Sequence, residues 1–225
     1  MLKKALQKLY EDKSKILWID KYQKCSDHDI DVYVRYEREG YFGWGHVATI
    51  IMLALNQFDS PYILDLGCGS GYYYRHLCKY VSGLNYVGCD NDFASYLAIY
   101  EDEFNKGNTD FVVADFAKNM PNPLKKKNFD VITWNGSYSC FDDDEHKKII
   151  ESASKKLGQN GILVVSDYFS EKNNSPWYYS INSARDEGKL RKIFQEVFDN
   201  VFLYIDKKEG GFYLLASNRK LPVNN

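Results

Sequence analysis

The chain has few residues of the kinds that build metal sites or disulfide frameworks. Five cysteines stand among its 225 residues, at positions 25, 68, 78, 89 and 140, and no two of them form a C-x-x-C pair. The four histidines, at positions 28, 46, 76 and 146, show no zinc-binding spacing. Because an odd number of scattered cysteines is typical of a reducing compartment, we expect a cytoplasmic protein without a metal ion.

Long apolar runs and an excess of charge are also missing. The longest apolar stretch, residues 47–55, is interrupted by Thr49 and is too short to span a bilayer. The first five residues, MLKKA, lack the apolar core of a signal peptide and are typical of an amphipathic helix. The net charge of −2 predicts no broad basic face for nucleic acid. We therefore expect neither a membrane protein nor a nucleic-acid-binding one.

The most informative segment of the chain is YILDLGCGSG, residues 62–71. Its short aliphatic run, bounded by turn residues, predicts a buried strand. Gly67, Gly69 and Gly71 then allow a tight turn and a close approach of another molecule, because they have no Cβ. Residues 72–80 are predicted as a helix whose first N–H groups face that turn. The arrangement predicts a nucleotide-type site at the carboxyl edge of a sheet.

The spacing of the glycines distinguishes between nucleotide sites. A dinucleotide site needs G-x-G-x-x-G, but Tyr72 stands at the place of the third glycine, and no Lys-Ser/Thr pair follows as in a P-loop. What remains, D-x-G-x-G-x-G, resembles motif I of the class I S-adenosylmethionine-dependent methyltransferases. The resemblance implies that Asp65 helps to hold the amino end of the cofactor's methionine. It also implies that the turn, with Cys68 and Ser70, lies under the cofactor.

Asp90 ends a second predicted strand, residues 85–90, and lies 23 positions after Gly67 (90 − 67). An acid at about this separation can accept hydrogen bonds from ribose hydroxyls. We include its neighbour Asn91 in the cofactor site. Asp90 can also cap a helix predicted over residues 93–104, and both roles can hold at once.

A third predicted strand, residues 110–114, is followed by Asp115 and Phe116. In the family that the chain resembles, this position flanks the adenine. Asp115 is therefore expected to accept from the adenine amino group and Phe116 to cover the ring. Ordinary core packing is the alternative for Phe116.

A fourth predicted strand, residues 129–134, leads into Asn135 and Tyr138. We assign Asn135 to the cofactor site and Tyr138 to the acceptor site. Family members that methylate amino nitrogens of bases or glutamine carry Asn-Pro-Pro-Tyr here, and this chain lacks both prolines. Since proline fixes φ, the loop is less rigid than in those enzymes. We favour an acceptor of another kind.

The order of the remaining elements predicts the fold. Helices are expected over residues 143–157 and 183–198, and strands over residues 161–167, 201–206 and 212–217. The predicted class is α/β, a doubly wound, mostly parallel seven-stranded sheet with an antiparallel last strand, the Rossmann-like methyltransferase fold. We expect a single domain with an N-terminal helical lid region (1–58), a cofactor-binding core (60–168) and an acceptor-side segment ending in a hairpin (169–225).

Specificity is expected to come from two aromatic-rich segments outside the core, residues 29–44 and 168–183. With Tyr138, the acceptor site would include Tyr33, Tyr41, Trp44 and Trp177. An oxygen acceptor or a protonated amine needs a base. His46 and His146 have a suitable pKa range, and we favour His46, beside the aromatic residues; Tyr168, with Asp167, is an alternative catalytic group.

We therefore expect an S-adenosylmethionine-dependent enzyme (EC 2.1.1 type) that methylates N or O of a small molecule. The sequence indicates neither the acceptor nor the oligomeric state. Two other interpretations stay open. One is a non-catalytic protein that binds the same cofactor. The other is a short-chain dehydrogenase, because Tyr168 and Lys172 satisfy Y-x-x-x-K; Tyr204 and Lys208 satisfy it too, as chance predicts, and the glycine spacing disfavours it.

Overall fold

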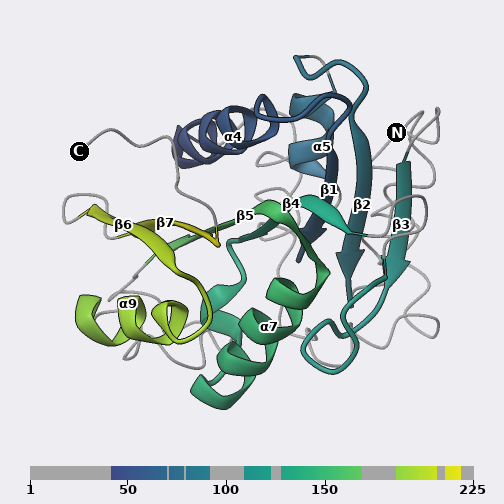
Figure 1. The fold of residues 1–225 in the computed structure, drawn as a ribbon. Helices are drawn as coiled ribbons and strands as arrows, with labels where there is room; N and C mark the ends of the chain where they lie inside the picture. Colours follow the sequence, from purple (N-terminus) through teal and green to yellow (C-terminus); the bar gives the residue numbers. More distant parts are fainter. Residues whose placement is uncertain are drawn as a thin grey trace, which may run out of the picture.

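The computed structural model describes residues 42–69, 71–78, 80–91, 109–122, 128–168, 186–206 and 211–218. These residues form one sheet of seven strands in the order β3-β2-β1-β4-β5-β7-β6 (Figure 1). The strands are β1 Tyr62–Leu66, β2 Asn85–Asp90, β3 Thr109–Val113, β4 Phe129–Asn135, β5 Leu157–Tyr168, β6 Asn200–Asp206 and β7 Gly211–Ser217.

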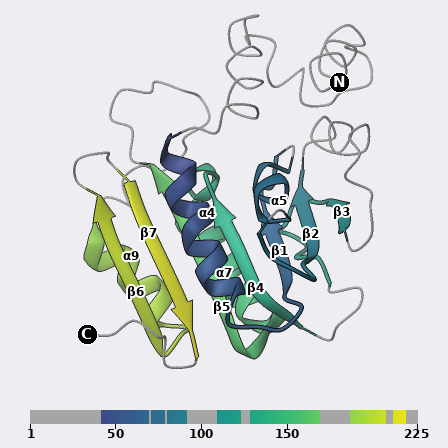
Figure 2. The same cartoon turned by 90° about the horizontal axis from the view of Figure 1, so that it is seen from above.

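The sheet has two parts of different strand direction. The first five strands pair in parallel, whereas β7 lies between β5 and β6 and is antiparallel to both. In Figure 2 the arrowheads of β4 and β7 accordingly point to opposite edges of the sheet. The predicted mixed sheet with its C-terminal hairpin is confirmed. A purely parallel dinucleotide fold, the basis of the dehydrogenase alternative, does not contain such a strand.

Helices cover both faces of the sheet (Figure 1). Helices α4 (Phe42–Leu55) and α5 (Tyr72–Leu77) lie on one face, and α7 (Asp143–Lys156) and α9 (Glu187–Gln195) lie on the other. A 3-10 turn, η2 (Tyr138–Cys140), follows β4. The predicted helices over 72–80 and 183–198 are present but shorter, and the predicted strand over 161–167 extends back to Leu157. The helix predicted over 93–104 lies outside the described residues.

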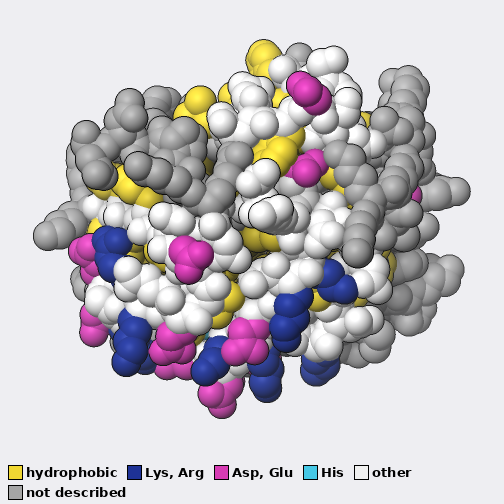
Figure 3. Space-filling view, in the orientation of Figure 1, with side chains coloured by type: hydrophobic (Ala, Val, Ile, Leu, Met, Phe, Trp, Pro, Cys, Tyr) yellow, Lys and Arg dark blue, Asp and Glu magenta, His cyan; other side chains and the backbone are white. Residues whose placement is uncertain are grey.

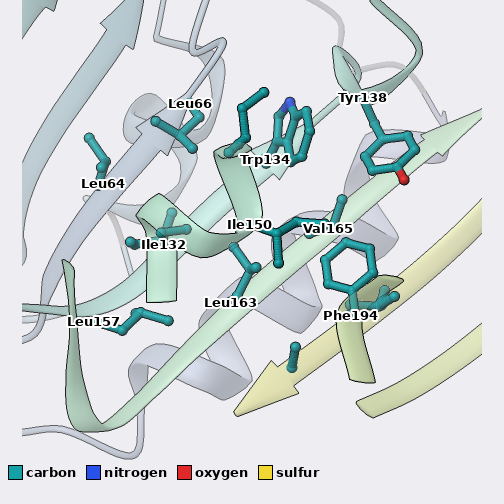
Figure 4. Packing of buried hydrophobic residues seen from close by; sticks show 14 of the residues in the cluster. Leu64, Leu66, Ile132, Trp134, Tyr138, Ile150, Leu157, Leu163, Val165 and Phe194 are labelled. Carbon is teal, nitrogen blue, oxygen red and sulfur yellow. The ribbon is translucent and has the colours of Figure 1, made fainter. Parts of the chain in front are cut away.

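The core consists of two layers, because successive side chains of a strand point to opposite faces. Toward α7 and α9, residues such as Leu64, Trp134 and Phe194 form the larger cluster (Figure 4). Toward α4 and α5, Ile51 and Ile63 belong to a second cluster. Both faces of β1 and β4 are buried, which explains why these strands are nearly continuous apolar runs in the sequence.

Several charged side chains on the described surface form pairs of opposite sign. Lys189 Nζ lies 2.6 Å from an Asp143 carboxylate oxygen, and Arg191 pairs with Glu187 at 3.1 Å. The face in Figure 3 accordingly mixes Lys and Arg with Asp and Glu along its lower edge. Within the described ranges, no helix has both the length and the apolar character that a bilayer crossing requires.

Asp142 begins α7 with a reciprocal pair of hydrogen bonds. Its side chain accepts from Glu145 N at 2.9 Å, and Glu145 Oε2 accepts from Asp142 N at 3.1 Å. We expect Asp142→Ala to lower the free energy of unfolding by about 0.5–2 kcal/mol, because N–H groups of the first turn lose their acceptor. Urea unfolding followed by circular dichroism tests this. Asp144→Ala, in the same turn but outside the capping box, is the control, and equal losses for the two variants would contradict the prediction.

Candidate functional site

The glycine turn between β1 and α5 has the backbone that the sequence predicts. Gly67, Gly69 and Gly71 have φ angles of 70°, 52° and 82°, a region that residues with a Cβ rarely adopt. The N–H groups of Gly67 and Cys68 both donate to Cys89 O, at 2.8 and 3.1 Å. These bonds fasten the turn to the carboxyl end of β2.

The loop after β4 packs directly on this turn. A Cβ placed on Gly67 would lie 2.4 Å from Ser137 Oγ, and that hydroxyl in turn accepts from Trp134 Nε1 at 3.1 Å. Gly136, in the same loop, donates its N–H to Ser166 O at 2.9 Å. The glycine turn and the ends of β4 and β5 therefore form one connected edge of the sheet.

Asp90 connects the end of β2 to the middle of the turn. Its Oδ2 accepts from Gly69 N at 2.9 Å. This places a partly exposed carboxylate beside the turn, where the sequence predicted a ribose-binding acid. Asn91 is exposed next to it, and Ser70 lies outside the described residues.

Asp65 lies deeper in the sheet. Only 1% of its surface is exposed, and its carboxylate accepts from Tyr86 Oη at 2.5 Å and from Thr133 Oγ1 at 2.7 Å. The pKa of Asp65 is raised to about 6, mainly by burial and to a smaller extent by the charge of Asp90, although the two hydrogen bonds lower it. Within the described residues, Asp65 has no ion-pair partner.

Asn135 ends β4 with one half of its amide satisfied. Its Oδ1 accepts from Ser166 Oγ at 2.8 Å, whereas its buried Nδ2 has no hydrogen-bond partner among the described residues. A buried amide N–H without an acceptor costs free energy unless something else supplies one. Asn135 is therefore a donor at the carboxyl edge that is available to a ligand.

The two residues after β3 have local partners in the structure. Asp115 accepts from Ala117 N at 3.2 Å and forms an exposed ion pair with Lys118 at 2.8 Å. Phe116 is buried in the larger core cluster, with its ring centroid 5.1 Å from that of Phe141 and 6.1 Å from that of Trp134. The contacts of Phe116 are thus those of an ordinary core residue. That its ring also covers the adenine stays a prediction.

Tyr138 and His146 stack on each other inside the core, with ring centroids 3.8 Å apart and only 8° between the planes. His146 Nε2 donates to Tyr138 O at 2.8 Å, and burial lowers the pKa of His146. His146 is therefore a buried core histidine, with 0% of its surface exposed. Tyr138, predicted as an acceptor-site residue, has 1% of its surface exposed.

Several predicted acceptor-side residues lie wholly or partly outside the described part of the chain. Tyr33, Tyr41 and Trp177 lie outside the described residues. His46 and Trp44 belong to α4 and Tyr168 to β5, but their side chains are likewise outside the description. The first turn of α4 lies toward the edge at which β4 ends (Figure 2).

Sequence reasoning missed the hydroxyl groups that hold the site's polar side chains: Tyr86, Thr133 and Ser166. The available signal was a polar side chain within an otherwise apolar strand, as in FDVITWN. A buried hydroxyl needs a partner, but the sequence does not say which strand supplies it. Across the described ranges, no group of three metal-binding side chains gathers anywhere.

The strands that form this edge match a known protein family. Residues 63–161, from β1 into β5, match the profile of a family described as a methyltransferase domain. No curated protein sequence matches the chain.

Solved structures share the fold over most of the chain. A TehB-like SAM-dependent methyltransferase from Corynebacterium glutamicum is 16% identical, with a TM-score of 0.61 over 86% of this chain and 97% of that one. The plantazolicin methyltransferase BpumL, solved with a desmethyl analogue and SAH, is 15% identical, with a TM-score of 0.64 over 90% and 95%. Magnesium protoporphyrin IX methyltransferase from Synechocystis, solved with SAM, is 14% identical, with a TM-score of 0.58 over 96% of each chain. At these identities the likeness is one of fold.

Gly67→Ala tests the packing of the turn. The new methyl would lie 2.4 Å from Ser137 Oγ on a backbone with φ of 70°, so we expect a loss of unfolding free energy of at least about 1–2 kcal/mol. Gly158→Ala is the matched control, since its Cβ would lie 3.6 Å from the nearest atom, Phe129 O. Urea unfolding of both variants measures the difference. Equal stabilities would show that the turn is not packed as described.

His146→Gln tests the buried imidazole. The lowered pKa means that, below the unfolded value of 6.5, the unfolded chain binds a proton that the folded protein does not, so folding weakens as the pH falls. Gln keeps an N–H for Tyr138 O but cannot titrate. We expect the stability advantage of the parent over the variant to shrink between pH 7.5 and pH 5.5 in urea unfolding. Parallel pH profiles would contradict this.

Proposed function

We propose that the protein is an S-adenosylmethionine-dependent methyltransferase that acts on a nitrogen or oxygen of a small molecule, since residues 63–161 match the profile of a methyltransferase domain. The observation that carries the proposal is the glycine turn at the end of the central strand, with Asp90 bonded to Gly69 N. The strand order and the antiparallel β7 support it, because they belong to the class I methyltransferase fold.

The donor and acceptor groups at this edge suit S-adenosylmethionine. The cofactor carries an ammonium, ribose hydroxyls and an adenine amino group but no phosphate, so carboxylates are appropriate partners. Asp65 would hold the ammonium, Asp90 the ribose and Asp115 the adenine amino group. The unpartnered Nδ2 of Asn135 would donate to an oxygen of the bound ligand. The glycine turn, without Cβ atoms, leaves room for close approach.

Catalysis requires little covalent chemistry from the protein. Bound S-adenosylmethionine supplies a methyl group that its sulfonium already activates. The task of the chain is to hold the acceptor atom in line with that methyl group and to exclude water. His46 or Tyr168 would take the proton from an oxygen acceptor or from a protonated amine.

The acceptor is proposed to be a small molecule. Two structural neighbours are named for plantazolicin and for magnesium protoporphyrin IX, which supports this class of acceptor for the present chain. The net charge of −2 disfavours a polyanionic substrate such as nucleic acid. Tyr33, Tyr41, Trp44 and Trp177, from the lid region and the acceptor-side segment, would line the acceptor pocket of a single-domain cytoplasmic enzyme.

Titration calorimetry with S-adenosylmethionine, S-adenosylhomocysteine, NADH and NADPH tests the proposal. We expect micromolar binding of the first two ligands and none of the nicotinamides. Methyl transfer is then sought with labelled S-adenosylmethionine and a panel of small amines, phenols and carboxylic acids. Binding without transfer to any acceptor would favour the non-catalytic interpretation, and no binding of either sulfur ligand would reject the proposed function.

Asp90→Ala should weaken S-adenosylmethionine binding by about 1–3 kcal/mol, because the ribose hydroxyls lose their acceptor. Asp90→Asn separates this role from support of the turn. Its side-chain oxygen can still accept from Gly69 N, but the amide replaces the second acceptor oxygen. We therefore expect Asp90→Asn to keep the melting temperature of the parent while losing affinity in calorimetry. Affinity equal to that of the parent would refute the ribose assignment.

A further inference from the structure

Three polar side chains meet inside the sheet beneath the glycine turn. They come from three neighbouring strands: Asp65 from β1, Tyr86 from β2 and Thr133 from β4. Asp65 and Thr133 are register partners, so their side chains lie side by side on the α4 face. Tyr86 pairs with Ile63, two positions earlier, and its long ring reaches forward to the carboxylate.

Gly88 makes this reach available. It lies opposite Asp65 in the register, and a side chain at this position would occupy the space through which Tyr86 reaches the Asp65 carboxylate. A Cβ there would lie 3.2 Å from Tyr86 Cε1 and 2.8 Å from Cys68 Sγ. The space that glycine leaves is therefore occupied by the tyrosine ring and the thiol, and β2 supplies a hydroxyl donor to β1 across it.

The carboxylate of Asp65 is buried with neutral partners only. Each oxygen accepts one hydroxyl, Oδ2 from Tyr86 and Oδ1 from Thr133, and no Lys or Arg within the described residues pairs with it. An ionised carboxylate has capacity for about four hydrogen bonds, so half of it remains. A buried negative charge without a counter-charge is costly, and a cationic ligand relieves that cost.

We propose that Tyr86 and Thr133 are positioning residues of the cofactor site, which keep the Asp65 carboxylate ionised and oriented toward the cofactor's ammonium and so set the pH below which the protein releases S-adenosylmethionine. This inference rests on the proposed function. Neither hydroxyl touches the cofactor in this assignment; each acts through Asp65.

The direction of the effect follows from the opposing influences on Asp65. Burial and the nearby Asp90 raise its pKa, the bonds from Tyr86 and Thr133 lower it, and the net result is a pKa of about 6. Among the described residues, the other titratable groups near it are the Cys68 and Cys89 thiols, and burial raises the pKa of both, so they stay neutral. Below about pH 7 the cofactor's amino group stays protonated, so affinity for the ammonium should there follow Asp65 and fall as the pH drops through 6.

Removing one hydroxyl should move this fall to higher pH. A hydrogen bond to a charged group contributes roughly 1.5–3 kcal/mol, which corresponds to about one pH unit or more. In calorimetry from pH 5.5 to 9, Tyr86→Phe and Thr133→Val are each expected to match the parent near pH 9 but to lose about tenfold in affinity at pH 6.5. Thr133→Ser, which keeps the hydroxyl, should restore the parent profile.

Two controls separate positioning from packing. Tyr74→Phe removes a hydroxyl from a ring that packs on Tyr86, with centroids 5.1 Å apart, but leaves the bond to Asp65; its profile should equal that of the parent. Asp65→Asn should bind weakly and should lack the fall in affinity between pH 7 and pH 5.5. A uniform loss of affinity at every pH in Tyr86→Phe would overturn the inference, because a structural defect produces that pattern.

A measurement on the ligand-free protein keeps the inference separate from the proposed function. NMR titration of 13C-labelled aspartate carboxyls, with the Asp65 signal identified by its loss in Asp65→Asn, reports the protonation of this group directly. We expect its midpoint to rise in Tyr86→Phe and in Thr133→Val. An unmoved midpoint rejects the inference, whereas absent cofactor binding together with a raised midpoint rejects only the cofactor assignment.

Discussion

The site depends on a backbone constraint, the left-handed conformation of three alternate residues after β1. Glycine adopts φ angles such as 70°, 52° and 82° with little strain, whereas residues with a Cβ rarely do. The turn they form is fixed from the β2 side by Cys89 O and by the Asp90 carboxylate. Because Ser137 then packs against Gly67, the position of the β4 loop follows from the same turn. The carboxyl edges of three strands are thereby fixed relative to one another.

This edge combines features that oppose folding with features that suit a ligand. Asp65 is buried without a cation among the described residues, and Asn135 keeps an amide N–H without an acceptor. Each costs stability in the free protein. The two core clusters, on both faces of the sheet, supply the compensating burial. Strain and unsatisfied polar groups at one place, supported by regular packing elsewhere, are common at functional sites.

The sequence predicted those parts of the protein that depend on local pattern. Short apolar runs located the strands, the three glycines located the turn, and Asp65 and Asp90 followed from their spacing to it. What depends on pairing between distant strands could not be predicted: Tyr86 meets Asp65 across a register that no local pattern specifies. Phe116 illustrates the same limit, since an apolar ring after a strand suits either core or cofactor, and only its contacts with Trp134 and Phe141 show where it packs.

The place of β7 between β5 and β6 has a consequence for biosynthesis. Although β6 precedes β7 in the chain, it contacts the sheet only through β7, so both strands must leave the ribosome before either can join. Until then the free edge of β5 exposes unpaired N–H and C=O groups, a template for pairing with other nascent chains. The glycine turn and its neighbouring strands are made much earlier, so the half that carries the site can form while the sheet still awaits its final edge.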